Sequence, residues 1–314
     1  MVINRCVDGV ALNHFKGTAE AMHKFGITLA AFCLLSCCAL AADSTSCDTL
    51  ISVNSHRLEV HQEGTGTPVV VFDAGLSDQL DKLRPLQARI ARVTRTITYN
   101  RAGYGRSEAG PMPRSAEQEV EELKTLLERV SGKGPYVLVG HSLGALNVQV
   151  FASKYQDMVA GMILMDPPPN SFIMGRKFQD LREMAEKMTA EWQAIADSSM
   201  QSGDANAMAT HAFFSAIISE HRKMFGESGK LVNAISSFGD IPLVVMASGK
   251  PNPAFGDDAE EFQKFWIEQS RALSKKSTRG EFILVKESSH YIYLDKPELV
   301  ADTILSVVRR IRGN

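Results

Sequence analysis

Four short and almost entirely apolar runs constrain most strongly how this chain can fold. They read PVVVFDAG, PYVLVG, AGMILMD and IPLVVMASG and span residues 68–75, 135–140, 160–166 and 241–249. Strands of a parallel sheet have this composition, because helices bury both of their faces. Segments with helical periodicity, such as residues 115–130, alternate with the runs. The sequence therefore predicts an α/β fold in which helices flank a mostly parallel sheet.

The N-terminal segment has the pattern of a secretory signal peptide and is not expected to belong to the fold. Residues 22–41 read MHKFGITLAAFCLLSCCALA, a short basic start followed by an apolar run and a small-x-small ending. Such a run is too short for a stable membrane span. We therefore expect a leader at residues 1–41, translation that starts at Met22, and an exported domain of residues 42–314, periplasmic or extracellular. A buried N-terminal helix is the alternative interpretation.

Cysteine usage limits how the exported domain can be anchored and held together. The segment from Leu34 to Cys37 resembles a lipoprotein box, so lipidation of Cys37 would attach the protein to a membrane. We expect membrane association only in that lipidated form.

Of the five cysteines, only Cys47 follows the predicted cut. The mature domain therefore cannot form an internal disulfide or a Cys-rich metal site.

The overall charge of the chain argues against a nucleic-acid partner. Lys and Arg number 34 and Asp and Glu number 36, which gives a formal net charge of -2. Proteins that bind nucleic acid neutralise phosphates with an excess of basic residues. We expect no such partner, and nothing in the sequence indicates a metal or an organic cofactor.

The sequence G-H-S-L-G at residues 140–144 fits the pattern G-x-S-x-G. An apolar run precedes it and a helical pattern follows, so Ser142 would lie on a sharp strand-to-helix turn. Such a turn leaves no room for side chains two positions on either side of the serine, which explains the glycines. It also directs the first N–H groups of the new helix toward an oxyanion. We predict that Ser142 is a nucleophile; a plain Gly-Ser turn is the alternative.

A serine nucleophile needs a base, and His290 is the best placed of the eight histidines. It follows a predicted strand, lies in the loop ESSHYIYLDKPEL and precedes the last helical pattern. His141 is adjacent to Ser142, but neighbouring side chains point in different directions, so we expect His141 to pack. Four other histidines lie in a predicted N-terminal hairpin or in the long helical segment before residue 240: His56, His61, His211 and His221.

Six motifs occur in a fixed order over about residues 50–314. They read VVVFDAGL, YNRAGYGRS, YVLVGHSLGA, AGMILMDP, PLVVMASG and SSHYIYLDKPELV. Together they resemble the α/β-hydrolase superfamily, in particular its serine esterases with a helical cap. The resemblance implies an eight-stranded sheet, with Ser142 after strand five, His290 after strand eight and a helical lid inserted after strand six. It also implies an oxyanion hole formed by the backbone N–H groups of Leu143 and Leu76, although DAGL replaces the usual His-Gly turn before Leu76.

The acid that orients the histidine has two candidate positions. In most similar proteins it follows strand seven, but that turn here holds no carboxylate until Asp257 and Asp258. Some superfamily members carry the acid at the end of strand six, where this chain has Asp166. We predict Asp166, with Asp257 or Asp258 as the alternative acid. An aspartate before proline also starts turns, so a purely structural role for Asp166 stays open.

The segment between the third and fourth apolar runs has a helical pattern and no clear strand. Pro167 opens it, and we expect a helical cap over the catalytic face at about residues 167–239. The segment carries six methionines and several aromatic residues. Flexible thioethers and rings suit an adaptable apolar pocket. The apolar underside that any cap needs for packing would explain the same composition.

The sequence thus predicts an exported serine hydrolase that cleaves carboxylic esters through an acyl-enzyme on Ser142. Its partner would be a small ester with an apolar acyl group. A cofactor-free haloperoxidase or perhydrolase, or an acyltransferase, could use the same residues. A non-catalytic ligand-binding protein with this fold is a further alternative. Dehalogenases and epoxide hydrolases of the superfamily place an aspartate at the elbow, and Ser142 cannot replace that carboxylate in their mechanism.

Overall fold

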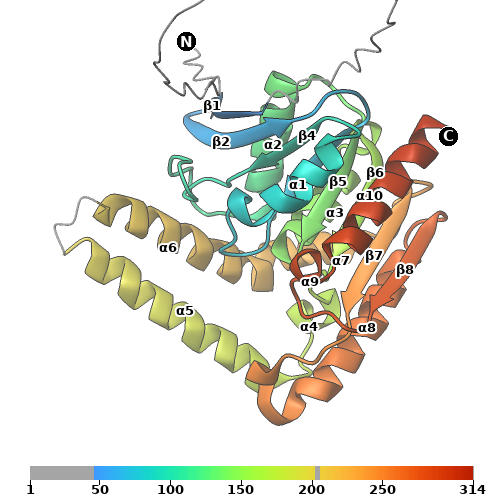
Figure 1. The fold of residues 1–314 in the computed structure, drawn as a ribbon. Helices are drawn as coiled ribbons and strands as arrows, with labels where there is room; N and C mark the ends of the chain where they lie inside the picture. The colour runs from blue at the N-terminus through green and yellow to red at the C-terminus, as the bar shows by residue number, and fades with distance from the viewer. Residues whose placement is uncertain (1–45, 202–205, 314) are drawn as a thin grey trace, which may run out of the picture.

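The computed structural model describes residues 46–201 and 206–313. These residues form an eight-stranded sheet in the order β1-β2-β4-β3-β5-β6-β7-β8 (Figure 1). β2 pairs antiparallel with β1 and with β4, and the other neighbouring strands are parallel. The prediction of a mostly parallel eight-stranded sheet is therefore confirmed. The strands are β1 (Cys47–Val53), β2 (His56–Glu63), β3 (Val69–Asp73), β4 (Thr96–Tyr99), β5 (Tyr136–His141), β6 (Val159–Met165), β7 (Leu243–Ser248) and β8 (Gly280–Val285).

Helices cover both faces of the sheet, which explains why the central strands are apolar throughout. On β5, Tyr136 and Leu138 belong to one core cluster and Val137 and Val139 to the other, and none of the four is exposed. The alternation follows from the two-residue period of a strand. The first cluster packs against α2 (Ala116–Val130) and α3 (Leu143–Lys154), the second against α1 (Arg84–Ala91) and α10 (Pro297–Arg312), and α8 (Ala259–Ser274) contacts β7 and β8.

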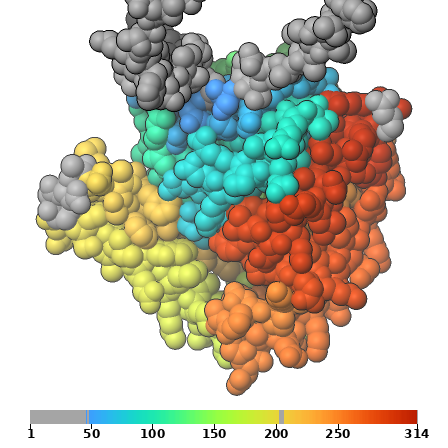
Figure 2. Space-filling view, viewed as in Figure 1, coloured from blue at the N-terminus to red at the C-terminus, as the bar shows by residue number. Residues whose placement is uncertain are grey.

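A group of helices lies between β6 and β7, within the segment 167–239 that the sequence assigned to a cap. Its two long helices, α5 and α6, pack against each other as a hairpin that projects from the sheet (Figures 1 and 2). The members are α4 (Asn170–Met174), α5 (Gln179–Ser199), α6 (Ala207–Lys223), the π-helical turn η3 (Met224–Ser228) and α7 (Gly229–Ala234). The remaining short helices are η1 (Leu80–Lys82), η2 (Gln156–Met158), η4 (Pro253–Asp258) and α9 (Ile292–Asp295).

The N-terminal predictions concern residues outside the part of the chain that the structure describes. These are the leader at residues 1–41, the start at Met22 and the lipidation of Cys37. Among residues 46–201 and 206–313, no helix is long and apolar enough to cross a lipid bilayer.

An aromatic cluster attaches the base of the cap to α8. Phe262 of α8 is only 2% exposed and packs edge-to-face against Phe172 of α4 and Phe178 at the start of α5, with ring centroids 4.9 Å apart in both pairs. Edge-to-face pairs add to the stability gained by burying the rings. Phe262 therefore joins two segments of the cap to the sheet-bearing body.

We expect Phe262→Ala to lower the free energy of unfolding by about 3–5 kcal/mol, because it removes a buried ring and leaves a cavity. Urea denaturation followed by circular dichroism would measure this change. Leu294→Ala is the control, since Leu294 is 50% exposed, and should change stability by less than about 0.5 kcal/mol. Equal denaturation midpoints for the two variants would contradict the assigned role of the cluster.

Candidate active site

Ser142 lies on a strained turn between β5 and α3. Its backbone has φ 50° and ψ -118°, a conformation that residues with a side chain rarely adopt and that concentrates at functional sites. A Cβ added at Gly140 would lie 2.5 Å from the Cα of Ala145, and one added at Gly144 would overlap the carbonyl oxygen of Asp73. Both glycines are therefore required by close backbone approaches, and the turn leaves Ser142 only partly buried.

Asp166 and His290 form a close pair. The Nδ1 atom of His290 lies 2.6 Å from Oδ2 of Asp166. A carboxylate only accepts hydrogen bonds, so Nδ1 carries the hydrogen and Nε2 is left free to act as a base. The pair joins the end of β6 to the loop after β8, as the prediction for Asp166 requires.

The carboxylate of Asp166 is also held by β7. The backbone N–H of Ser248 donates to Oδ1 at 2.8 Å, and its hydroxyl donates to Oδ2 at 2.9 Å. Asp166 itself is 2% exposed and has a φ of 49°. These contacts fix both oxygens of the carboxylate, and the sequence analysis did not identify Ser248 as the residue that does so.

The alternative acids lie elsewhere. Asp257 is exposed and Asp258 partly exposed, and both belong to η4. Among the described residues, neither makes a hydrogen bond or an ion pair with His290, whereas Asp166 does. The structure thus favours Asp166 over the strand-seven position.

Two further side chains hold the loop that carries His290. The Nε2 atom of His141 lies 3.0 Å from the carbonyl oxygen of His290, and the two rings are 4.7 Å apart. Burial lowers the pKa of His141, and its contact with Asp78 opposes this only in part, so His141 acts as a neutral donor. On the other side, Asp295 accepts from the N–H and the hydroxyl of Ser289, each at 2.6 Å. His141 therefore does more than the packing predicted for it.

The two predicted oxyanion donors come from adjoining segments. Leu143 is the first residue of α3, so its N–H has no acceptor within the helix. Leu76 follows Gly75, and a Cβ added at Gly75 would lie 2.9 Å from Nδ1 of His141. The loop before η1 therefore packs directly against the strand end that carries Ser142. In the described part of the chain the Ser142 hydroxyl makes no hydrogen bond.

The candidate site is located by its chemistry rather than by the size of a cavity. A groove of about 910 Å³ lies at the opposite, amino-terminal ends of the parallel strands, where residues 64–68 meet Arg95 and Arg312. A cavity of about 400 Å³ lies in the cap and is lined in part by Thr189 and His221. Neither is lined by a member of the Ser-His-Asp group. Among the described residues, no cluster of three or more His, Cys, Asp or Glu side chains could hold a metal ion.

Comparisons with known proteins identify the family and the fold of the chain. The family model described as "Alpha/beta hydrolase family" matches residues 60–303. The uncharacterized protein YqjL of Bacillus subtilis (strain 168) is 29% identical over 249 residues, which cover 79% of this chain and 86% of YqjL. The Cif epoxide hydrolase from Acinetobacter nosocomialis has a similar structure, with a TM-score of 0.66 and 15% identity over 84% of this chain and 89% of its own. A thermophilic esterase from Thermogutta terrifontis has a TM-score of 0.62 and 18% identity over 84% and 98%.

We expect Asp166→Asn to lower kcat for an ester substrate by about a thousandfold or more, because the amide cannot hold His290 in the productive tautomer. Steady-state kinetics at saturating ester would measure the loss. Asp257→Asn and Asp258→Asn are matched controls and should retain the wild-type kcat. A fully active Asp166→Asn enzyme would refute the assignment.

Proposed function

Because the chain belongs to the alpha/beta hydrolase family, we propose that it is a serine hydrolase that cleaves carboxylic esters through an acyl-enzyme on Ser142. The observation that carries this proposal is the 2.6 Å contact between His290 and Asp166 beside a strained turn that presents a serine. Epoxide hydrolases are among the similar structures, but their chemistry needs an aspartate where this chain has Ser142. The identity of the elbow residue therefore favours acyl transfer.

The mechanism follows from the positions of these groups. Nε2 of His290 takes the proton from the Ser142 hydroxyl as its oxygen attacks the ester carbonyl carbon. The resulting oxyanion accepts hydrogen bonds from the N–H groups of Leu143 and Leu76, and Asp166 stabilises the imidazolium. The tetrahedral intermediate collapses when His290 returns the proton to the departing alcohol. Water then attacks the acyl-enzyme by the same steps and releases the acid and the free serine.

The substrate class is an ester with an apolar acyl group. Leu76, beside the proposed oxyanion hole, packs in a cluster with Trp192 of α5 and Phe213 of α6. On α5, Met184 and Met188 are 42% and 40% exposed and lie one helical turn apart. Met188 is four residues before Trp192 on α5 and therefore on the same helix face; flexible thioethers there suit an acyl chain of variable shape. These features support an apolar acyl group.

Export is part of the same proposal. Its support is the signal-peptide pattern of residues 22–41, with cleavage after Ala41. In the alternative lipoprotein form, cleavage precedes Cys37, and the lipid on that cysteine holds the enzyme at a membrane. The intact mass of the mature protein, isolated from cells that export it, tests both statements. A mass that includes the leader would contradict export, and a mass without added lipid would contradict anchoring at Cys37.

We expect a fluorophosphonate probe to add one stoichiometric adduct to the folded protein and none to Ser142→Ala, since only an activated serine hydroxyl reacts quickly. Intact-mass spectrometry would count the adducts. The variant should also lose several orders of magnitude in kcat toward esters. The heat-denatured wild-type protein controls for nonspecific labelling. If the folded wild-type protein stays unlabelled and hydrolyses no ester, the proposed function is wrong.

A further inference from the structure

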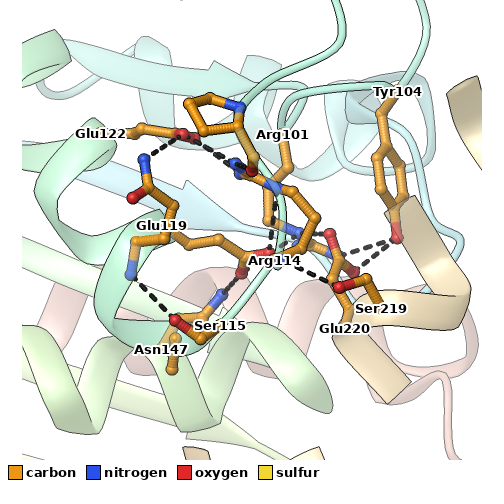
Figure 3. A network of polar contacts seen from close by, with 12 residues as sticks. Arg101, Tyr104, Arg114, Ser115, Glu119, Glu122, Asn147, Ser219 and Glu220 are labelled. Atoms are coloured by element: carbon orange, nitrogen blue, oxygen red, sulfur yellow. Dashed lines mark hydrogen bonds and ion pairs between the residues drawn. The ribbon is translucent and has the colours of Figure 1, made fainter. Parts of the chain in front are cut away.

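Arg101 is a buried arginine whose N–H groups are all engaged. It lies two residues after β4, and its side chain is 3% exposed. The guanidinium donates to the carboxylate of Glu220 at 3.0 and 3.1 Å and to that of Asp73 at 2.8 Å. It also donates to the backbone carbonyl oxygens of Ala74 at 2.7 Å and Gly75 at 2.9 Å. These contacts use the five N–H donors of a guanidinium, and Figure 3 shows Arg101 inside the network.

The contact with Gly75, together with the hydrogen bond that the backbone N–H of Asp78 donates to the same carbonyl at 3.2 Å, fixes the direction of the next N–H group. The peptide bond between Gly75 and Leu76 is planar and trans, so its carbonyl and its N–H point in opposite directions. The carbonyl points at Arg101. The N–H of Leu76 therefore points away from Arg101, and this N–H is one of the two donors in the proposed oxyanion hole. Arg101 thus binds the carbonyl on the opposite side of the peptide plane from that N–H.

Glu220 of α6 extends this arrangement into the cap. Its side chain is 1% exposed and, besides Arg101, it accepts a hydrogen bond from the Tyr104 hydroxyl at 2.6 Å. The oxygen of Tyr104 in turn accepts from the backbone N–H of Ser77 at 3.2 Å. Glu220 thus holds both the guanidinium of Arg101, which binds the carbonyl before Leu76, and the hydroxyl of Tyr104, which binds the N–H after it. Without Glu220, the buried charge of Arg101 would lose a close partner.

We propose that Arg101 is a positioning residue for the oxyanion hole and that Glu220 of the cap completes it. The N–H of Leu76 is then correctly directed only while α6 is docked on the body. This inference rests on the proposed serine hydrolase function. It connects the cap, whose rings and methionines would hold the acyl group, to the stabilisation of the transition state.

The experiment compares Arg101→Lys with Arg114→Lys in the full-length protein. Arg114 is the matched control, because it is buried in the same network and pairs with Glu122 at 2.6 Å but contacts no residue of the loop 74–77. A lysine at position 101 keeps the charge but cannot reach both carbonyls and Glu220 at once. We expect Arg101→Lys to lower kcat by about a hundredfold, as for a lost oxyanion donor, with KM nearly unchanged.

A second measurement does not depend on activity. Hydrogen exchange followed by mass spectrometry should be faster in peptides that cover residues 73–78 of Arg101→Lys, and unchanged there in Arg114→Lys. A general loss of stability would instead affect both variants in proportion to their melting temperatures. If kcat and exchange change equally in the two variants, Arg101 is only structural and the inference is overturned.

A second pair of variants covers the case in which Arg101→Lys does not fold. Tyr104→Phe removes only the hydroxyl that joins Ser77 to Glu220. Tyr99→Phe removes a hydroxyl that donates to Asp73 at 2.9 Å in the same network. A kcat loss confined to Tyr104→Phe supports the inference, and equal effects overturn it. If the wild-type protein reacts with the fluorophosphonate but both pairs of variants behave alike, only this inference is wrong. If the wild-type protein is unreactive and inactive, the proposed function is wrong, and this inference fails with it.

Discussion

The buried carboxylate of Asp166 is the interaction on which the arrangement of the candidate site depends. A buried carboxylate is costly unless its oxygens receive hydrogen bonds. Here Ser248 supplies two and His290 a third. Because the Asp166 carboxylate needs these hydrogen bonds, the end of β6, the end of β7 and the loop after β8 lie together. The same contacts that stabilise the charge therefore position His290, the proposed base, so the stability of the fold and the geometry of the candidate site have a common origin.

Features that depend on local sequence were predictable. The apolar runs required strands buried on both faces, and the two glycines around Ser142 required a turn without side chains. His290 followed from its place between the last strand and the last helix. The order of acid candidates was less certain, because the sequence alone does not show which of Asp166 and Asp257 reaches His290. The pairing depends on how the loops after β6, β7 and β8 close over the sheet.

Contacts between distant segments were not predictable. Arg101 and Glu220 are 119 residues apart, and His141 donates to the backbone of a residue 149 positions later. Nothing in the helical pattern of α6 distinguishes Glu220 from a solvent-exposed glutamate. The charge of Glu220 also affects a neighbour: burial of Glu119, together with this charge, raises the pKa of Glu119 well above its ordinary value. This shift follows only from the three-dimensional arrangement.

The strained backbone of Ser142 lowers the stability of the fold at the residue on which the proposed activity depends. A non-glycine residue in such a sparsely populated conformation costs folding free energy of about 1–3 kcal/mol, and a glycine there would avoid this cost. Ser142→Gly would therefore relieve the strain and at the same time remove the proposed nucleophile. If Ser142 acts as proposed, the protein gives up this part of its folding free energy for a reactive hydroxyl.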